Sequence, residues 1–136
     1  MDKDVTSGRC LCGAFQFEID RPIGDVRLCH CQLCRWANGS AYSAHAKVPL
    51  DRFRVVQQLS AITSFESSPG AHKHFCSVCG APVFSKVDWD TDHIRIRLGS
   101  LSADANANIT AHVWVGSKAN WDHIADDLPQ FDKQAL

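Results

Sequence analysis

The sequence lacks the features of several large classes of protein. No apolar stretch approaches the roughly 20 residues needed to cross a bilayer, and there is no run of Lys or Arg. The formal net charge of -1 argues against a protein whose main work is to grip nucleic acid or an anionic membrane. Residues 1–5 contain no apolar core of a signal peptide, and repeats and low-complexity segments are absent. We therefore expect a soluble protein of the cytoplasm that binds neither nucleic acid nor membranes.

The composition is that of an ordinary globular domain. A chain of 136 residues with 45% hydrophobic content is long enough to bury roughly two-thirds of its unfolded surface around one core. This predicts a single domain over residues 1–136. Nothing in the sequence indicates an oligomeric state.

Seven cysteines dominate what the sequence does contain. They form three groups along the chain: Cys10 and Cys12, then Cys29, Cys31 and Cys34, then Cys76 and Cys79. Four thiolates from two separated turns make a closed tetrahedral zinc site, whereas three from one turn leave a coordination position free. The spacing therefore predicts two zinc ions per chain, a structural ion held by the two outer pairs and a catalytic ion held by the central three.

Other uses of the cysteines stay open at this point. A disulfide framework would need an oxidising compartment, and the odd number of cysteines argues against it. Four thiolates can hold iron as well as zinc, although the C-x-x-C turn at Cys76 is typical of a zinc-ribbon knuckle. A fourth protein ligand, such as His30, His72 or His74, would close the central site and remove the argument for catalysis.

Period-two alternation of apolar and polar residues predicts strands along most of the chain. Phe15, Phe17 and Ile19 share one face of the first strand. The expected strands cover residues 14–20, 26–28, 41–48, 53–57, 62–66, 72–75, 82–87, 94–98 and 112–115. Short helical turns are expected at residues 32–36 and 121–128, the second ending before Pro129. The pattern predicts an all-β fold with short helical turns.

A few other side chains are candidates for a substrate site. Arg95 and Arg97 alternate with isoleucines and are expected on an exposed strand face, where solvation is usual but a carboxylate could bind. The four tryptophans are expected to pack in the core, with Trp36 the best candidate for a pocket wall. His30 and His45 could move a proton, although surface and packing roles are more common for histidine.

The order of these motifs resembles the glutathione-dependent formaldehyde-activating enzyme family. The matching segments are residues 8–13, 29–35, 75–80, 99–101 and 112–114, followed by Lys118 and Trp121. The resemblance spans nearly the whole chain. It implies a tent of antiparallel sheets with zinc between them. It also implies structural zinc at Cys10, Cys12, Cys76 and Cys79, and catalytic zinc at Cys29, Cys31 and Cys34.

The resemblance also implies an activity. Such an enzyme is a zinc-dependent carbon-sulfur lyase that acts on a thiol-aldehyde adduct such as S-hydroxymethylglutathione, formed from glutathione and formaldehyde. Residues 102–108 lack the acidic-proline turn expected after Leu101, so a family member with a different thiol substrate is one alternative. A non-catalytic, zinc-stabilised interaction module is another. A chromatin role like that of centromere protein V, which resembles the same family, would call for a basic region that this chain lacks.

Overall fold

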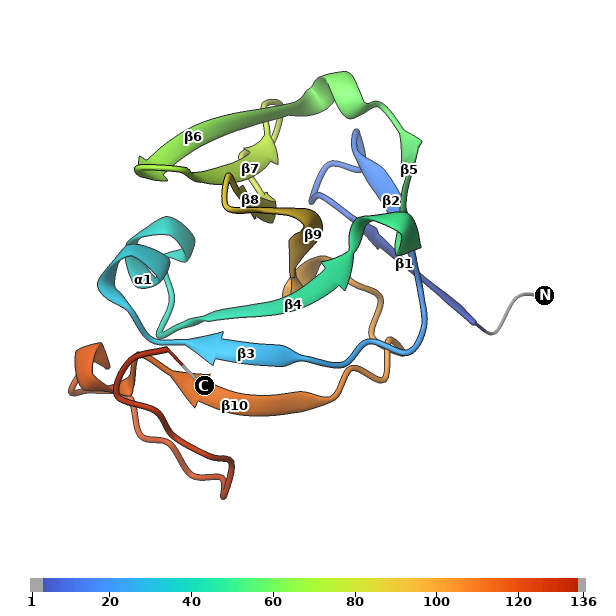
Figure 1. Cartoon of the computed structure of the whole chain (residues 1–136). Coiled ribbons are helices and arrows are strands. Elements are labelled where there is room, and N and C mark those ends of the chain that lie inside the picture. Colours follow the sequence, from blue (N-terminus) through green and yellow to red (C-terminus); the bar gives the residue numbers. More distant parts are fainter. Residues whose placement is uncertain (1–3, 135–136) are drawn as a thin grey trace.

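The computed structural model describes residues 4–134 and contains two β-sheets (Figure 1). Residues 1–3 and 135–136, which the single-domain prediction includes, lie outside the described residues. The smaller sheet has the strand order β1-β2-β5, with β1 at Val5–Arg9, β2 at Gln16–Asp20 and β5 at Phe53–Gln57. The all-β prediction is confirmed.

The larger sheet has seven strands. In spatial order they are β10 (Ile109–Val113), β3 (Val26–Cys29), β4 (Ser43–Pro49), β9 (Asp90–Arg97), β8 (Pro82–Val87), β7 (Ala71–Cys76) and β6 (Ile62–Ser68). Every pairing in the two sheets is antiparallel except that of β10 with β3, which is parallel. The expectation of purely antiparallel sheets is wrong at this pair. Residues 101–108 carry the chain back to the opposite end of the sheet before β10 starts, and a parallel pair needs such a long connection.

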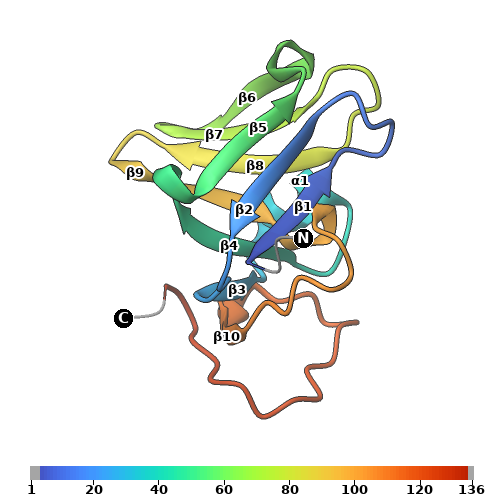
Figure 2. The same ribbon diagram turned by 90° about the vertical axis from the view of Figure 1, so that its right-hand side faces the viewer.

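The hydrophobic core lies between the two sheets, where the smaller one crosses the larger (Figure 2). The alternation in β2 places Phe17 and Ile19 on the buried face, as predicted, and Phe15 precedes them on the same face. The ring of Phe84 in β8 lies 6.1 Å from that of Phe15 and 5.9 Å from that of Phe53 in β5. Aromatic contacts therefore hold one sheet against the other.

Strand β1 was not predicted, because residues 5–9 carry little apolar alternation. β1 pairs with β2 in a register that places Gly8 opposite Phe17. A Cβ atom at Gly8 would lie 2.2 Å from Cζ of Phe17, so only glycine lets the strand pass over this ring. Gly8 thus allows close packing between β1 and β2.

The helical elements are short. The α-helix α1 spans Gln32–Asn38 and confirms the helical turn expected at residues 32–36. It ends at Gly39, which has a left-handed conformation with φ 63°. Four 3-10 turns complete the helical structure, η1 (Leu50–Arg52), η2 (Leu59–Ala61), η3 (Leu98–Ser100) and η4 (Val115–Ser117).

The helix expected at residues 121–128 is wrong. This part of the chain is irregular, and the segment that follows runs beside β10 (Figure 1). The N–H of His112 donates to the carbonyl of Pro129 at 2.9 Å, and the N–H of Phe131 donates to the carbonyl of His112 at 3.0 Å. These backbone hydrogen bonds hold an extended segment against β10, which a helix ending at Pro129 could not provide.

The tryptophans do not fill the core. Trp36, Trp89 and Trp121 are exposed, and only Trp114 is half-buried, so the expectation of core packing is wrong for three of the four. Phenylalanine and isoleucine side chains already fill the space between the sheets. In residues 4–134 no helix has the length and apolar character needed to cross a membrane.

Candidate metal centres and an adjoining cavity

The first cysteine cluster joins the two sheets. Cys10 and Cys12 lie in the turn after β1, whereas Cys76 and Cys79 lie at the end of β7 and in the turn that follows. The Sγ atoms of all four lie within 4.8 Å of one another. The Sγ atom of Cys12 lies 3.7 Å from that of Cys10 and 3.8 Å from that of Cys76. A tetrahedral zinc ion with bonds of about 2.3 Å to sulfur requires sulfur atoms about 3.8 Å apart, so this cluster fits zinc.

Local backbone geometry supports these thiols as ligands. Gly13 and Gly80 have φ of 80° and 79°, which lets the chain turn back at each knuckle. The N–H of Phe15 donates to Sγ of Cys10, and the N–H of Val78 donates to Sγ of Cys76, each at 3.4 Å. A hydrogen bond from the backbone of Ala81 lowers the pKa of Cys79 to about 6. Such donors favour the thiolate, which is the form that binds metal.

The second cluster is built from one turn. Cys29 ends β3, Cys31 is the N-cap of α1 and Cys34 lies in the first turn of that helix. Their Sγ atoms lie within 4.8 Å of one another, and the N–H of Cys34 donates to Sγ of Cys31 at 3.3 Å. The helical turn therefore aims an N–H group at the cluster.

The three thiols of this cluster depend on one another for their charge. Hydrogen bonds from Cys29 and Cys34 bring the pKa of Cys31 far below its usual range, while hydrogen bonding to Cys31 and Cys34 raises the pKa of Cys29. Three sulfurs this close cannot all carry charge unless a cation is among them. The donor set thus fits a divalent ion that prefers sulfur, such as zinc.

The three histidines considered as a fourth ligand face other partners. His30 points to His112, while His72 contacts Asp88 at 3.0 Å in a separate exposed group with Glu66. His74 stacks on Phe84 with ring centroids 4.5 Å apart. Among residues 4–134, no His, Asp or Glu joins the central three cysteines. The described residues thus offer three thiols there, which would leave one position of a tetrahedral ion for another molecule.

A buried pair of histidines lies beside this cluster. Nε2 of His30 lies 2.8 Å from Nδ1 of His112, and Nε2 of His112 lies 3.0 Å from a carboxylate oxygen of Asp126. The hydrogen bond from His112 lowers the pKa of the Asp126 carboxyl, which is therefore ionised near neutral pH. A carboxylate only accepts hydrogen bonds, so His112 donates through Nε2 and neutral His112 accepts at Nδ1 from His30. The carboxylate thus fixes the tautomers of both imidazoles.

The sequence did not predict this histidine pair. His30 and His112 are 82 positions apart, and they meet because β10 runs parallel to β3, with Val113 opposite Cys29. That register would have brought them together had the parallel pair been expected. His45, the second histidine considered for proton transfer, is in β4, and burial lowers its pKa to about 3. It is neutral near pH 7.

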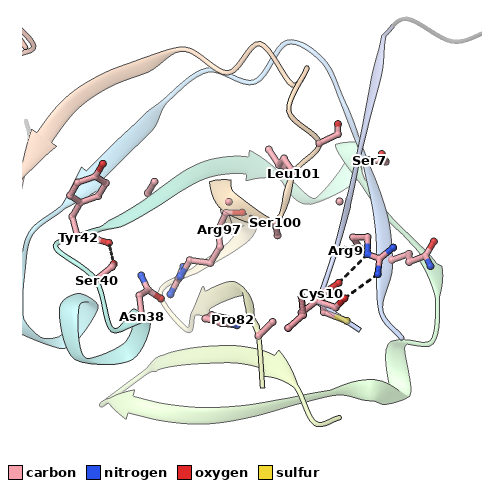
Figure 3. A pocket seen from close by; sticks show the side chains of 17 residues that line it. Ser7, Arg9, Cys10, Asn38, Ser40, Tyr42, Pro82, Arg97, Ser100 and Leu101 are labelled. Carbon is pink, nitrogen blue, oxygen red and sulfur yellow. Dashed lines mark hydrogen bonds between the residues drawn. The ribbon is translucent and has the colours of Figure 1, made fainter. Parts of the chain in front are cut away.

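A cavity of about 790 Å³ opens beside the first cluster, and Cys10 is part of its lining (Figure 3). Its walls come from β1 and the turn that holds Cys10 and Cys12, from the end of α1 and the loop after it, and from the chain around η3. Arg97 lines it and is only 7% exposed, so the expectation of an exposed arginine at this position is wrong. The face of β9 that carries Arg97 turns into the cavity. Trp36 is 68% exposed and not part of the lining, so the prediction that it forms a pocket wall is also wrong.

The chain is similar to known proteins both in sequence and in fold. A family model described as glutathione-dependent formaldehyde-activating enzyme matches residues 5–117. A crystal structure of a Rhodobacter sphaeroides protein is 24% identical in sequence, with a TM-score of 0.60. This similarity covers 71% of the present chain and 88% of the other, and it shows a shared fold. The family match ends before Asp122 and Asp126, so the segment that contacts the histidine pair lies beyond it.

Proposed function

The chain belongs to the glutathione-dependent formaldehyde-activating enzyme family, and on this basis we propose that it is a zinc-dependent carbon-sulfur lyase. The proposed substrates are a small thiol, such as glutathione, and formaldehyde. The observation that carries the proposal is the grouping of three thiols on one turn without a fourth protein ligand among residues 4–134. An interaction module would be expected to close its metal sites.

We assign different roles to the two clusters. Cys10, Cys12, Cys76 and Cys79 would hold a structural zinc ion, whereas Cys29, Cys31 and Cys34 would hold the catalytic one. A zinc ion with three thiolate ligands offers a position at which a substrate thiol binds and loses its proton. We also propose that the protein works in the cytoplasm, because its seven cysteines are free of disulfides.

The proposed reaction joins the thiol sulfur to the aldehyde carbon. As the carbon-sulfur bond forms, the π bond of the carbonyl group breaks and its oxygen receives the proton that the thiol has lost. The reverse reaction breaks the carbon-sulfur bond and releases thiol and aldehyde.

His30 has a positioning role in this proposal. Its side chain is fully buried, with Nε2 facing His112 and Nδ1 lying 3.6 Å from a carboxylate oxygen of Asp122. Through these contacts His30 would hold its neighbours Cys29 and Cys31 in position. Because its side chain is buried, it would not contact the substrate.

The test is an NMR measurement of formaldehyde exchange with glutathione, made together with the zinc-to-protein ratio. We expect two zinc ions and exchange faster than the uncatalysed rate, with the acceleration lost in Cys34→Ser. Trp36→Ala is the matched control, because it changes an exposed residue of the same helix. Two zinc ions without acceleration would contradict the proposal and favour another thiol or an interaction module.

A further inference from the structure

A row of polar side chains crosses one face of the larger sheet. Residues directly opposite each other in an antiparallel pair project from the same face of a sheet. Cys29 in β3 is opposite Ser43 in β4, and His45, two residues further along β4, is opposite Arg97 in β9. Ile96, the neighbour of Arg97, belongs to the hydrophobic core on the other face. The row therefore lies on the face away from the core and begins at the central cluster.

The same row continues to β7. Arg95, which shares a face of β9 with Arg97, is opposite Ser85 in β8, and Ser85 is opposite Lys73 in β7. These pairings place Lys73 on the face that carries Cys29. The larger sheet bends, so that β7 and α1 come to face each other (Figure 1). Lys73 thus lies on the side of the sheet where the central cluster lies.

The cations of this face differ in whether a carboxylate neutralises them. Lys47 and Arg95 contact a carboxylate oxygen of Asp90, at 3.8 and 3.4 Å. Within residues 4–134, by contrast, no carboxylate forms an ion pair with Lys73 or Arg97. The two cations without a carboxylate therefore leave a positive charge on this face.

Lys73 and Arg97 differ in accessibility. Arg97 is 7% exposed, and its Nη1 donates to Oγ of Ser85 at 3.3 Å, so its guanidinium group is held inside the protein. Lys73 is half-buried. A half-buried lysine packs its aliphatic stem and keeps its ammonium group in reach of other molecules. Lys73 is therefore the cation of this pair that can contact a small molecule at the central cluster.

The charge of Lys73 acts on the central thiols. Hydrogen bonds from Cys29 and Cys34 are the main cause that lowers the pKa of Cys31, and the positive charge of Lys73 adds to this effect. Hydrogen bonding to Cys29 and the charge of Lys73 also lower the pKa of Cys34, although hydrogen bonding to Cys31 and burial raise it overall. Lys73 is thus close enough to the cluster for its charge to favour an anion there.

The proposed reaction creates an anion at this place. As the thiol sulfur attacks the aldehyde, the π electrons of the carbonyl group move to its oxygen, which becomes negatively charged in the transition state. A cation fixed beside that oxygen stabilises the transition state more than the bound aldehyde, and only such a difference accelerates the reaction. An accessible ammonium group next to the central thiols has the charge and the donors for this task.

We propose that Lys73 is a catalytic residue whose ammonium group donates a hydrogen bond to the aldehyde oxygen and stabilises its developing negative charge. This inference rests on the proposed function. The sulfur lone pair forms the carbon-sulfur bond, the π pair of the carbonyl group moves to oxygen, and the proton lost by the thiol returns to that oxygen through water. Lys73 stays protonated throughout. In the reverse reaction it stabilises the same oxygen as the carbon-sulfur bond breaks.

The first test measures kcat and KM for the reaction of glutathione with formaldehyde, using the zinc-loaded full chain. In Lys73→Met, kcat should fall roughly tenfold to a hundredfold, the usual effect of losing a hydrogen bond to a charged group. KM for glutathione and the zinc content should stay unchanged, because the lost contact forms in the transition state. Lys73→Arg keeps a positive charge and should keep most of the activity. Lys86→Met is the matched control, because Lys86 lies in the neighbouring strand on the opposite face, over the ring of Phe84.

The second test detects the charge of Lys73 without turnover and without glutathione. Cys31 and Cys34 of the zinc-loaded chain are alkylated with anionic iodoacetate or with neutral iodoacetamide, and mass spectrometry gives the rate at each cysteine. In both reactions the thiolate sulfur displaces iodide from the same kind of carbon, so the ratio of the two rates reports the local charge. The ratio of the iodoacetate rate to the iodoacetamide rate should fall in Lys73→Met and stay unchanged in Lys73→Arg and Lys86→Met.

Several results would overturn the proposal. A higher KM for glutathione in Lys73→Met with unchanged kcat would show that Lys73 binds the thiol in its ground state. An unchanged alkylation ratio in Lys73→Met would show that the ammonium group does not face the cluster. Acceleration by the native protein that persists in Lys73→Met would refute this inference alone. No acceleration by the native protein would refute the lyase proposal and the catalytic role of Lys73 with it, and the alkylation ratio would then report only where its charge lies.

Discussion

Nε2 of His30 lies 2.8 Å from Nδ1 of His112, and this contact joins the turn that carries Cys29, Cys31 and Cys34 to the edge strand β10. Both side chains are buried, with 0% and 3% exposure, so each depends on the other for a hydrogen bond. The hydrogen bonds among His30, His112 and Asp126 therefore hold the backbone at His30, and with it Cys29 and Cys31, in one conformation.

Replacement of His112 by alanine should destabilise the protein. It leaves Nε2 of His30 buried without a partner, which typically costs about 1–3 kcal/mol. We expect a lower free energy of unfolding in urea and faster loss of one zinc ion to a chelator. Asp126→Asn is the control, because its amide oxygen can still accept from His112. The positioning role would be wrong if His112→Ala lost zinc no faster than this control.

The two cysteine clusters should respond differently to a single substitution. Cys76→Ser would remove a ligand of the proposed structural zinc site, and structural zinc contributes on the order of 10 kcal/mol to folding in small modules. We expect this variant to be largely unfolded by circular dichroism. Cys34→Ser should remain folded with one zinc ion fewer and no turnover. Equal loss of folding in both variants would rule out separate roles.

Gly8 should not tolerate even a methyl group. Alanine at this position would place Cβ 2.2 Å from Cζ of Phe17, and overpacking of this kind costs about 1–3 kcal/mol. Chemical denaturation of Gly8→Ala should show this loss. Gly99→Ala is a suitable comparison, because a Cβ atom there meets nothing within 4 Å. Similar stabilities for the two variants would contradict the packing described between β1 and β2.

Asp90 should remain ionised in acid. It accepts hydrogen bonds from Nδ1 of His93 at 3.0 Å and from the N–H of Asp92 at 3.2 Å, and the first of these is the main cause that lowers its pKa to about 2. A carboxyl with a lowered folded-state pKa stabilises the fold above its unfolded pKa of 3.8, and this contribution disappears as the pH falls towards 2.

The carbon-13 shift of the Asp90 carboxyl group, followed from neutral pH downwards, measures this directly. We expect it still to report a carboxylate at about pH 3, where an ordinary aspartate is mostly protonated. In the same range, the stability difference between the native protein and Asp90→Asn should shrink. A midpoint near the ordinary value would mean that the His93 contact does not form in solution.

Local patterns in the sequence predicted much of the fold. The alternation of Phe15, Phe17 and Ile19 correctly predicted a half-buried strand, since burial on one face imposes period two. The cysteine spacing predicted the central cluster, because thiols within one turn are necessarily close in space, whereas the grouping of the two outer pairs followed from the four ligands that a closed site needs. The pattern failed at residues 121–128, which are irregular, and the chain pairs with β10 only from Pro129 onwards.

Contacts between distant residues could not be predicted in the same way. Arg97 looked like a solvated arginine because alternation shows which residues share a face but not what covers that face. The pairing of His30 with His112 requires the parallel register of β3 and β10, and a single sequence carries no signal for it. The grouping of the cysteines was therefore predicted from the sequence, whereas the cavity and the histidine pair came from the tertiary structure.

The segment that runs beside β10 also affects how the protein can associate with other chains. Its hydrogen bonds at His112 occupy backbone groups that would otherwise be open to a strand from another molecule. The opposite margin of the seven-stranded sheet is β6, which pairs only with β7 and exposes the side chain of Phe65. Within the larger sheet, a strand from another chain could therefore add at β6, far in the sheet order from the β3 turn that carries the central cysteines.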